Sequence, residues 1–149
     1  MTMTNQEYFD ATVAGLRAQG EPAFDGYSCK YRLTKGDKTL KCAAGLHIPD
    51  GVYHSGMETN LVDTLDCLRG LGTPELRRDL QRVHDIAAGD DDVAVASFAR
   101  CHTDARVPAI AIYNSMAAID PTWTGPWLNR VEAGFKHIAE KYQLNYTSP

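Results

Sequence analysis

The sequence predicts an α+β fold: a mainly helical single domain over residues 1–149, with a two-stranded antiparallel β-hairpin packed on a helix bundle. Two observations lead to this expectation. Short segments on either side of the turn 35–38 alternate apolar and basic residues, as the strands of a half-buried hairpin do. Most of the remaining chain repeats apolar residues every three or four positions, which is the period of an amphipathic helix. A chain of this length can bury a sizeable core without covalent cross-links.

In the hairpin, pairing Leu33 with Leu40 across the turn sorts the side chains onto two faces. Successive residues of a strand point to opposite sides, so a shift by one residue would exchange the faces. We expect one face to pack on the helices and the other to be exposed and basic. The first carries Cys29, Tyr31, Leu33, Leu40, Cys42 and Ala44, and the second carries Lys30, Arg32, Thr34, Thr39, Lys41 and Ala43.

Helical spacing and stop signals predict helices over 5–19, 58–71, 74–88 and 126–142. Apolar residues recur in steps of three and four along the whole of the last one, which indicates that it lies on the core. Residues 45–48 suggest a single helical turn before a proline ends it. Helices at 58–71 and 74–88, joined by so short a connection, are expected to lie antiparallel.

Local signals mark two of these helix starts. Thr73 and Pro74 supply an N-cap and a proline at the first helical position. Ser55 and Glu58 have the spacing of a capping box, which predicts the start of the second helix. Between residues 93 and 120 the pattern is weak. Its first part suits a helix, and its second part is left open between a helix and a strand.

Composition narrows the function classes. The net charge of -4, with 44% apolar and 23% charged residues, is ordinary for a globular protein and makes nucleic acid an unlikely partner. Apolar runs are far too short to span a membrane, and the N-terminus lacks the features of a secretory signal, so we expect a cytoplasmic protein with reduced thiols. No phosphate-binding loop, dinucleotide fingerprint or metalloprotease motif is present. We therefore expect no cofactor.

Several short motifs are carried by Cys29-Lys-Tyr-Arg, Lys41-Cys-Ala-Ala-Gly, Ile48-Pro-Asp50, Tyr53, Met57-Glu58, and Leu80-Gln followed by His84-Asp85. In these motifs the chain resembles a family of small uncharacterised proteins of tailed bacteriophages, over roughly residues 5–86. It departs from the pattern at Leu46 and at His47, where an apolar residue is expected. The resemblance implies no activity. It implies a phage protein acting in the host cytoplasm, accessory to the virion.

Cys42 is the candidate nucleophile for thiol chemistry, because a cysteine before a glycine turn can meet backbone N–H groups. His84 and Asp85 would supply the base and the carboxylate that accompany such a thiol. The competing interpretation is favoured: Cys42 falls on the apolar face, and His84 is a hydrogen-bonded core histidine. Neighbouring residues on a helix also point about 100° apart, so Asp85 is not expected to orient His84.

A metal site is the next possibility, and we expect none. Cys29 and Cys42 share one face of the hairpin, but structural zinc sites bring their ligands in close pairs such as C-x-x-C. This chain has no such spacing among its remaining candidates, which are His47, His54, Cys101 and His102.

The basic hairpin face is the candidate binding surface. Residues 27–41 hold five cations and one acid, a local charge of +4 (five minus one) in a chain of net charge -4. Such a patch suits an anionic ligand or an acidic partner, although solvated charge on an exposed strand is the simpler explanation. Nucleic acid is disfavoured because Tyr31 faces inward. The predicted contacts on this face are Lys30, Arg32, Lys38 and Lys41.

Trp123 and Trp127 flank a Gly-Pro turn and are also candidate binding residues, since large aromatic side chains often anchor partners. Alternatively, they clamp the start of the last helix onto the core.

Together these patterns lead to a functional hypothesis. The chain is expected to be a phage accessory protein of the host-interaction or anti-defence type, which binds a host protein or a small anionic ligand through the hairpin face. The alternative is a thiol-dependent hydrolase or transferase with Cys42 as nucleophile and a histidine as base. A homodimer formed through residues 93–120 is a third possibility.

Overall fold

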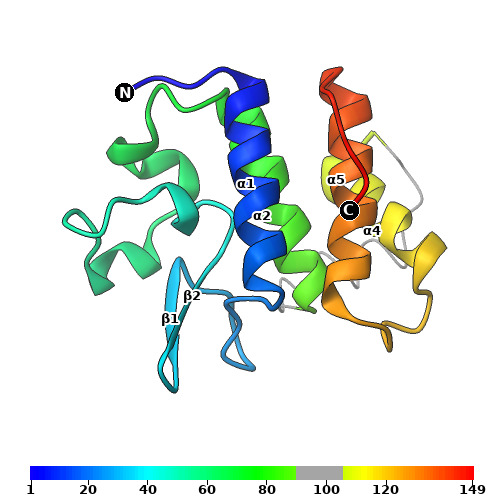
Figure 1. Ribbon diagram of the computed structural model, residues 1–149, viewed down its shortest axis with the longest axis horizontal. Helices are drawn as coiled ribbons and strands as arrows, with labels where there is room; N and C mark the ends of the chain where they lie inside the picture. Colours follow the sequence, from blue (N-terminus) through cyan, green and yellow to red (C-terminus); the bar gives the residue numbers. More distant parts are fainter. Residues whose placement is uncertain (90–105) are drawn as a thin grey trace.

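The computed structural model describes residues 1–89 and 106–149, and it confirms the α+β fold, with a helical body and one hairpin (Figure 1). The hairpin is a two-stranded antiparallel sheet. No helix among the described residues is long and apolar enough to cross a membrane. The helices and strands are α1 (Asn5–Gln19), β1 (Arg32–Lys35), β2 (Lys38–Lys41), α2 (Pro74–Ala88), α4 (Pro108–Ile119) and α5 (Trp127–Tyr142).

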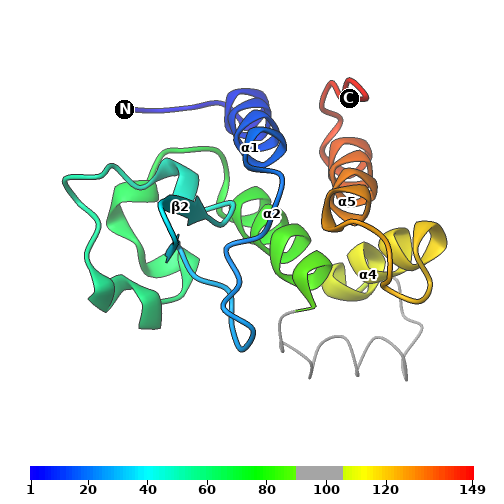
Figure 2. The same ribbon diagram turned by 60° about the horizontal axis from the view of Figure 1, so that its bottom comes forward.

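Helix α2 is the centre of the described structure. It contacts α1, α4 and α5. Figures 1 and 2 show α4 and α5 on one side of the α1–α2 pair, and the hairpin with the irregular segment that follows it on the other. The molecule therefore has a helical half and a hairpin half, which meet along α1 and α2.

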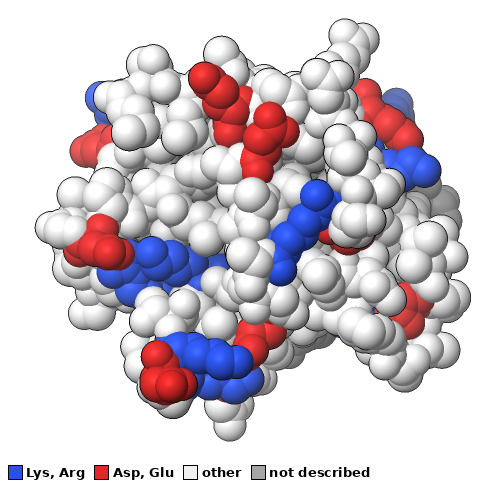
Figure 3. Space-filling model, viewed as in Figure 1, with Lys and Arg blue, Asp and Glu red and all other residues white. Residues whose placement is uncertain are grey.

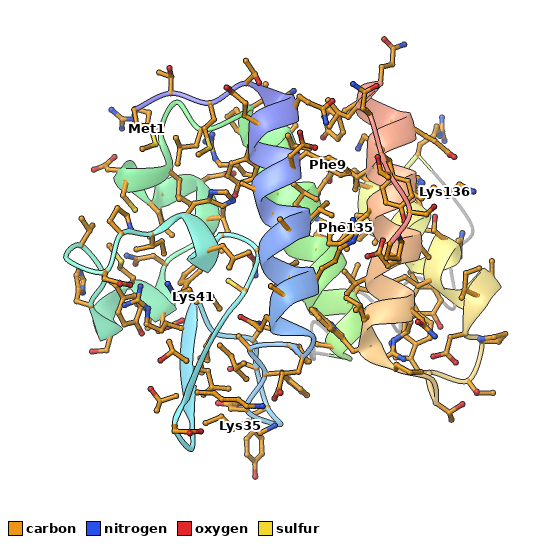
Figure 4. The ribbon with its side chains drawn as sticks, viewed as in Figure 1. Met1, Phe9, Lys35, Lys41, Phe135 and Lys136 are labelled. Carbon is orange, nitrogen blue, oxygen red and sulfur yellow. The ribbon has the colours of Figure 1, made fainter. Side chains whose placement is uncertain are left out.

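Apolar packing joins α5 to its neighbours in the helical half. Phe9 of α1 and Phe135 of α5 point toward each other, with ring centroids 6.2 Å apart in an edge-to-face arrangement (Figure 4). Gly134 lies where a Cβ would meet Val83 of α2 and Met116 of α4. The absence of a side chain at that position allows the three helices to approach closely.

Three of the four predicted helices are confirmed. The predicted bounds 5–19 and 74–88 match α1 and α2, and the predicted helix 126–142 begins one residue later, at Trp127. Thr73 caps α2 and Pro74 opens it, as expected. The second part of the region 93–120, for which the sequence favours neither a helix nor a strand, is a helix, α4. Residues 93–105 of that prediction lie outside the described residues.

The predicted helix over 58–71 is wrong. This segment instead forms short 3-10 turns, Ser55–Thr59, Val62–Thr64 and Asp66–Leu68. The N-cap of the first of these turns is His54, not Ser55, and no side chain caps it. Long-range hydrogen bonds outweigh the local helical pattern, because the Glu58 carboxylate turns away to the hairpin. Since no helix forms over 58–71, the expected antiparallel pair with α2 is absent as well.

The hairpin has the predicted register, with Leu33 opposite Leu40, but it is shorter than expected. Tyr31, Leu40 and Cys42 are buried, as predicted for the apolar face. The ladder ends at Lys41, so the expected pairing does not continue to the outer residues. Ala43, predicted on the exposed face, is buried because the chain turns inward there, toward the 3-10 turn Gly45–His47.

Gly45 fixes how this inward turn meets the hairpin. A Cβ built on Gly45 would overlap the carbonyl oxygen of Tyr31. We expect Gly45→Ala to destabilise the fold by about 3 kcal/mol, because a backbone oxygen cannot move aside as a flexible side chain does. Urea denaturation measures the change. The matched control is Gly51→Ala, where the new Cβ would meet no atom within 4 Å. Equal stability of the two variants would contradict this account of the turn.

Candidate functional site

Glu58 connects the hairpin to the irregular segment beside it. Its carboxylate accepts hydrogen bonds from the backbone N–H groups of Tyr31 (2.7 Å) and Arg32 (3.1 Å) and from the hydroxyl of Tyr53 (2.7 Å). The Arg32 guanidinium lies over the Tyr53 ring, 4.4 Å from its centroid. These contacts engage both oxygens of Glu58 and hold the start of β1 in place.

Helix α2 reaches the hairpin half through three polar side chains. Gln81 accepts from the N–H of Ala44 (2.9 Å) and donates to Asp85 Oδ1 (2.8 Å). His84 Nδ1 lies 2.8 Å from the same carboxylate oxygen, and His84 Nε2 accepts from the N–H of Ala23 (3.1 Å). Because Nε2 accepts, the neutral ring carries its proton on Nδ1 and donates it to Asp85.

This geometry confirms that His84 is a buried, hydrogen-bonded histidine. It corrects the expectation that Asp85 cannot orient it. The Cα–Cβ directions of adjacent helical residues do diverge, but a carboxylate has rotatable bonds that let it fold back to the neighbouring ring. Both ring nitrogens are engaged, so His84 has no lone pair available to act as a base in this state.

A pocket of about 460 Å³ opens between the hairpin, the segment 58–63 and α2. Much of its wall comes from residues of the motifs quoted for the phage-protein resemblance, which are far apart in the sequence and meet here. The pocket is lined by Cys29, Lys30, Tyr31, Glu58, Asn60, Leu61, Val62, Asp63, Arg78, Gln81, Arg82 and Asp85.

Formal charge in this pocket is balanced, with three cations and three acids in its lining. The hydrogen bonds of these charged groups are not balanced, because the acids accept bonds within the chain while some of the cations keep N–H groups without an acceptor in the described part of the chain. Glu58 and Asp85 accept the bonds described above, and Asp63 pairs with Arg78 at 2.9 Å. Each acid of the wall therefore already has at least one partner within the chain.

The remaining cations of the wall keep unused donors. Among the described residues, Arg82 donates a single hydrogen bond, from Nη1 to Asp79. The Lys30 ammonium makes no hydrogen bond within the described ranges, and its acidic neighbour Asp25 is 3.9 Å away. The wall thus offers more donors than acceptors.

Cys42 does not reach this pocket. Its exposed fraction is 0%, and the N–H of Gly45 donates to its sulfur at 3.4 Å. Burial raises the pKa of the Cys42 thiol, and the negative charge of Asp85 raises it further. The core interpretation of Cys42 is confirmed, and a substrate has no access to it as a nucleophile.

The basic hairpin face is largely neutralised by acids from outside the segment. Lys35 and Lys38 pair with Glu21, Arg32 and Lys41 pair with Asp50, and Lys30 lies near Asp25. Counting these three acids with Asp37 leaves a charge of +1 (five minus four), where the segment alone gives +4. On the face shown in Figure 3, Lys and Arg side chains over the hairpin lie beside Asp and Glu side chains. In Figure 4, Lys35 lies at the tip of the hairpin and Lys41 at its base.

The two tryptophans clamp α5 onto α2. Trp127 is buried and donates to the carbonyl of His84 at 3.4 Å, and Trp123 donates to the carbonyl of Ile86 at 3.3 Å. Arg130 lies over the Trp123 ring, 5.5 Å from its centroid. The ring of Trp127, predicted as a binding residue, is enclosed, which agrees with the alternative that it clamps the helix onto the core. Trp123 is half-buried in the same clamp.

The predicted metal candidates that lie among the described residues, Cys29, Cys42, His47 and His54, do not form a common cluster. His47 stacks on Tyr8 and bonds Thr12 Oγ1 at 2.8 Å, while His54 is exposed. Cys101 and His102 lie outside the described residues. A different group lies close together: the ligand atoms of Cys29, His84 and Asp85 are all within 4.8 Å of one another. The sequence does not reveal this group, because Cys29 and the pair His84 and Asp85 are far apart in the chain and meet only in the folded structure.

Comparison of the chain with protein-family models, curated proteins and solved structures finds no match.

The burial of Cys42 predicts its reactivity. With iodoacetamide at pH 8, we expect Cys67, which is half-buried, to be alkylated at least tenfold faster than Cys42, because only the exposed thiolate reacts. Peptide mass spectrometry of the native protein over time measures both rates. Denaturant should remove the difference. Rapid labelling of native Cys42 would contradict the core placement.

His47 predicts a stability change with pH. Burial lowers the pKa of His47 to about 4 from its ordinary 6.5. Between these values the unfolded chain binds a proton that the folded protein does not, so stability falls as the pH falls from about 6.5 to about 4, by up to about 3 kcal/mol. His47→Phe keeps a ring against Tyr8 and does not titrate. Urea denaturation of both proteins at several pH values should show a smaller loss in the variant; an equal loss would exclude His47 as the cause.

Proposed function

We propose that this chain is a binding protein for a small anionic ligand, a phosphate- or carboxylate-bearing molecule, which it takes into the pocket between the hairpin and α2. The observation that carries the proposal is the excess of hydrogen-bond donors on the wall. Lys30 and Arg82 have N–H groups to offer, whereas the nearby carboxylates Glu58 and Asp85 already accept hydrogen bonds within the chain. A ligand rich in acceptor oxygens satisfies those donors, and charge-assisted bonds of this kind are the strong ones.

The size and the walls of the pocket support the same proposal. A volume of about 460 Å³ lies within the range of small-molecule sites. Tyr31, Leu61 and Val62 supply apolar wall next to the two cations. Leu61 is 76% exposed, so its side chain is accessible to a ligand in the pocket. An anionic group carried on an apolar or aromatic body fits this combination.

The pocket is favoured over the rest of the hairpin face as the contact surface. Arg32, Lys38 and Lys41 already have acidic partners within the chain, and Arg32 is also packed on Tyr53. Only Lys30 of the predicted basic contacts lines the pocket. A phage accessory protein acting in the host cytoplasm, the setting that the resemblance implies, is the context we propose for this binding. A host metabolite is then the expected source of the ligand.

Variants of the two donors test this function. Isothermal titration calorimetry of the full chain with adenosine monophosphate, citrate and inorganic phosphate should detect binding of at least one probe with a dissociation constant in the millimolar range or tighter. Lys30→Met and Arg82→Met each replace a long cationic side chain by a shorter, flexible and uncharged one. We expect each to weaken binding roughly tenfold, the value of one charge-assisted hydrogen bond.

Lys35→Met is the control, because Lys35 is likewise a lysine with an acidic neighbour, Glu21, but lies at the hairpin tip away from the pocket. It should bind as the unaltered chain does, and circular dichroism should show all three variants folded at the temperature of the titration; a lower thermal midpoint is expected for Arg82→Met, which removes an ion pair with the buried Asp79. The proposal is overturned if no probe binds, or if Lys35→Met weakens binding as much as Lys30→Met and Arg82→Met.

A further inference from the structure

Cys29, His84 and Asp85 form a cluster of three chemically different metal ligands. A thiol sulfur, a ring nitrogen and a carboxylate oxygen lie within 4.8 Å of one another. Cys29 comes from the segment before β1, whereas His84 and Asp85 come from the inner face of α2. Sulfur, nitrogen and oxygen together are a donor set that suits Zn²⁺, and three protein ligands with one open position are the pattern of catalytic or ligand-binding zinc sites.

The surroundings of the cluster meet two further requirements of a metal site. Cys29 and Asp85 line the pocket, so a cation held between them has a route from solvent and an open side that faces the pocket. Gln81 donates to Asp85 Oδ1 and is itself fixed by the N–H of Ala44. Such outer hydrogen bonds orient ligating carboxylates in known metal sites.

Binding of a cation by His84 would break an existing hydrogen bond of its ring. If Nδ1 binds the cation, the ring proton moves to Nε2, and the N–H of Ala23 loses its acceptor. If Nε2 binds the cation, its lone pair is withdrawn from the same N–H. Either way the bond between Ala23 and His84 is broken, and the Cys29 thiol releases one proton to solvent. The Ala23 amide is therefore a specific reporter of the site.

We propose that Cys29, His84 and Asp85 bind a divalent zinc-type cation, with the fourth position open to the pocket. The site is separate from the anion donors Lys30 and Arg82, so it does not rest on the proposed function. A cation there would add positive charge to the same wall and provide a direct ligand position for an anionic molecule.

Titration of the reduced full-length chain with Co²⁺, a spectroscopic substitute for Zn²⁺, tests the site. We expect one equivalent to bind with a thiolate-to-cobalt charge-transfer band in the near ultraviolet and the intense visible bands of four-coordinate cobalt, both removed by Zn²⁺. In a parallel NMR titration with Zn²⁺, the Ala23 amide resonance should shift, since its hydrogen bond is lost.

Cys29→Ser should abolish the charge-transfer band and weaken binding at least a hundredfold. Asp85→Asn, which keeps the shape of the side chain, should weaken it at least tenfold. Cys67→Ser is the matched control and should change neither, and Lys30→Met should leave the cobalt spectrum unchanged, which separates this test from that of the anion pocket. The proposal is overturned if no charge-transfer band appears, if the band survives Cys29→Ser, or if the Ala23 amide does not respond.

Discussion

The hydrogen bonds between α2 and the hairpin half are the constraint on which the rest of this structure depends. Gln81, His84 and Asp85 occupy about one turn of α2, and each makes a bond that leaves the helix or supports one that does. Their backbone partners are the N–H groups of Ala23 and Ala44, which lie before and after the hairpin. Buried N–H groups need acceptors, so these two contacts fix where the hairpin enters and leaves the helical body.

The pocket is a consequence of this docking. Glu58 accepts from backbone N–H groups of the hairpin half, Asp85 accepts from Gln81 and His84, and Asp63 pairs with Arg78, so each acid of the wall already has a partner within the chain. Lys30 and Arg82 on the same wall keep N–H groups that form no hydrogen bond among the described residues. The way the hairpin half is attached to α2 therefore leaves the pocket wall with more available donors than acceptors. The balanced formal charge of the lining does not reveal this excess.

The sequence predicts the elements of this structure better than their contacts. The register of Leu33 and Leu40 follows from strict alternation along two short strands, and α5 follows from its unbroken helical spacing. Residues 58–71 show the same apolar spacing and yet form 3-10 turns, because the Glu58 carboxylate bonds to β1 and not to its own segment. A capping-box pattern contains no information about a competing partner from another part of the chain.

The candidate site shows the same limit. The motif residues were identified in the sequence, but the pairing of Cys29, and not Cys42, with His84 depends on how the segment before β1 crosses α2. The basic face was overestimated for a related reason: Glu21 and Asp50 lie outside the hairpin in sequence and beside it in space. Local charge counts omit partners of that kind.

The central claim, that the docking of the hairpin on α2 creates a donor-rich anion pocket, is tested most directly by mapping where an anion binds. In a ¹⁵N NMR titration with adenosine monophosphate, the account predicts that shift changes concentrate at residues 29–31, 58–63 and 78–85. Changes concentrated at the hairpin tip, residues 34–39, with none along α2, would contradict it.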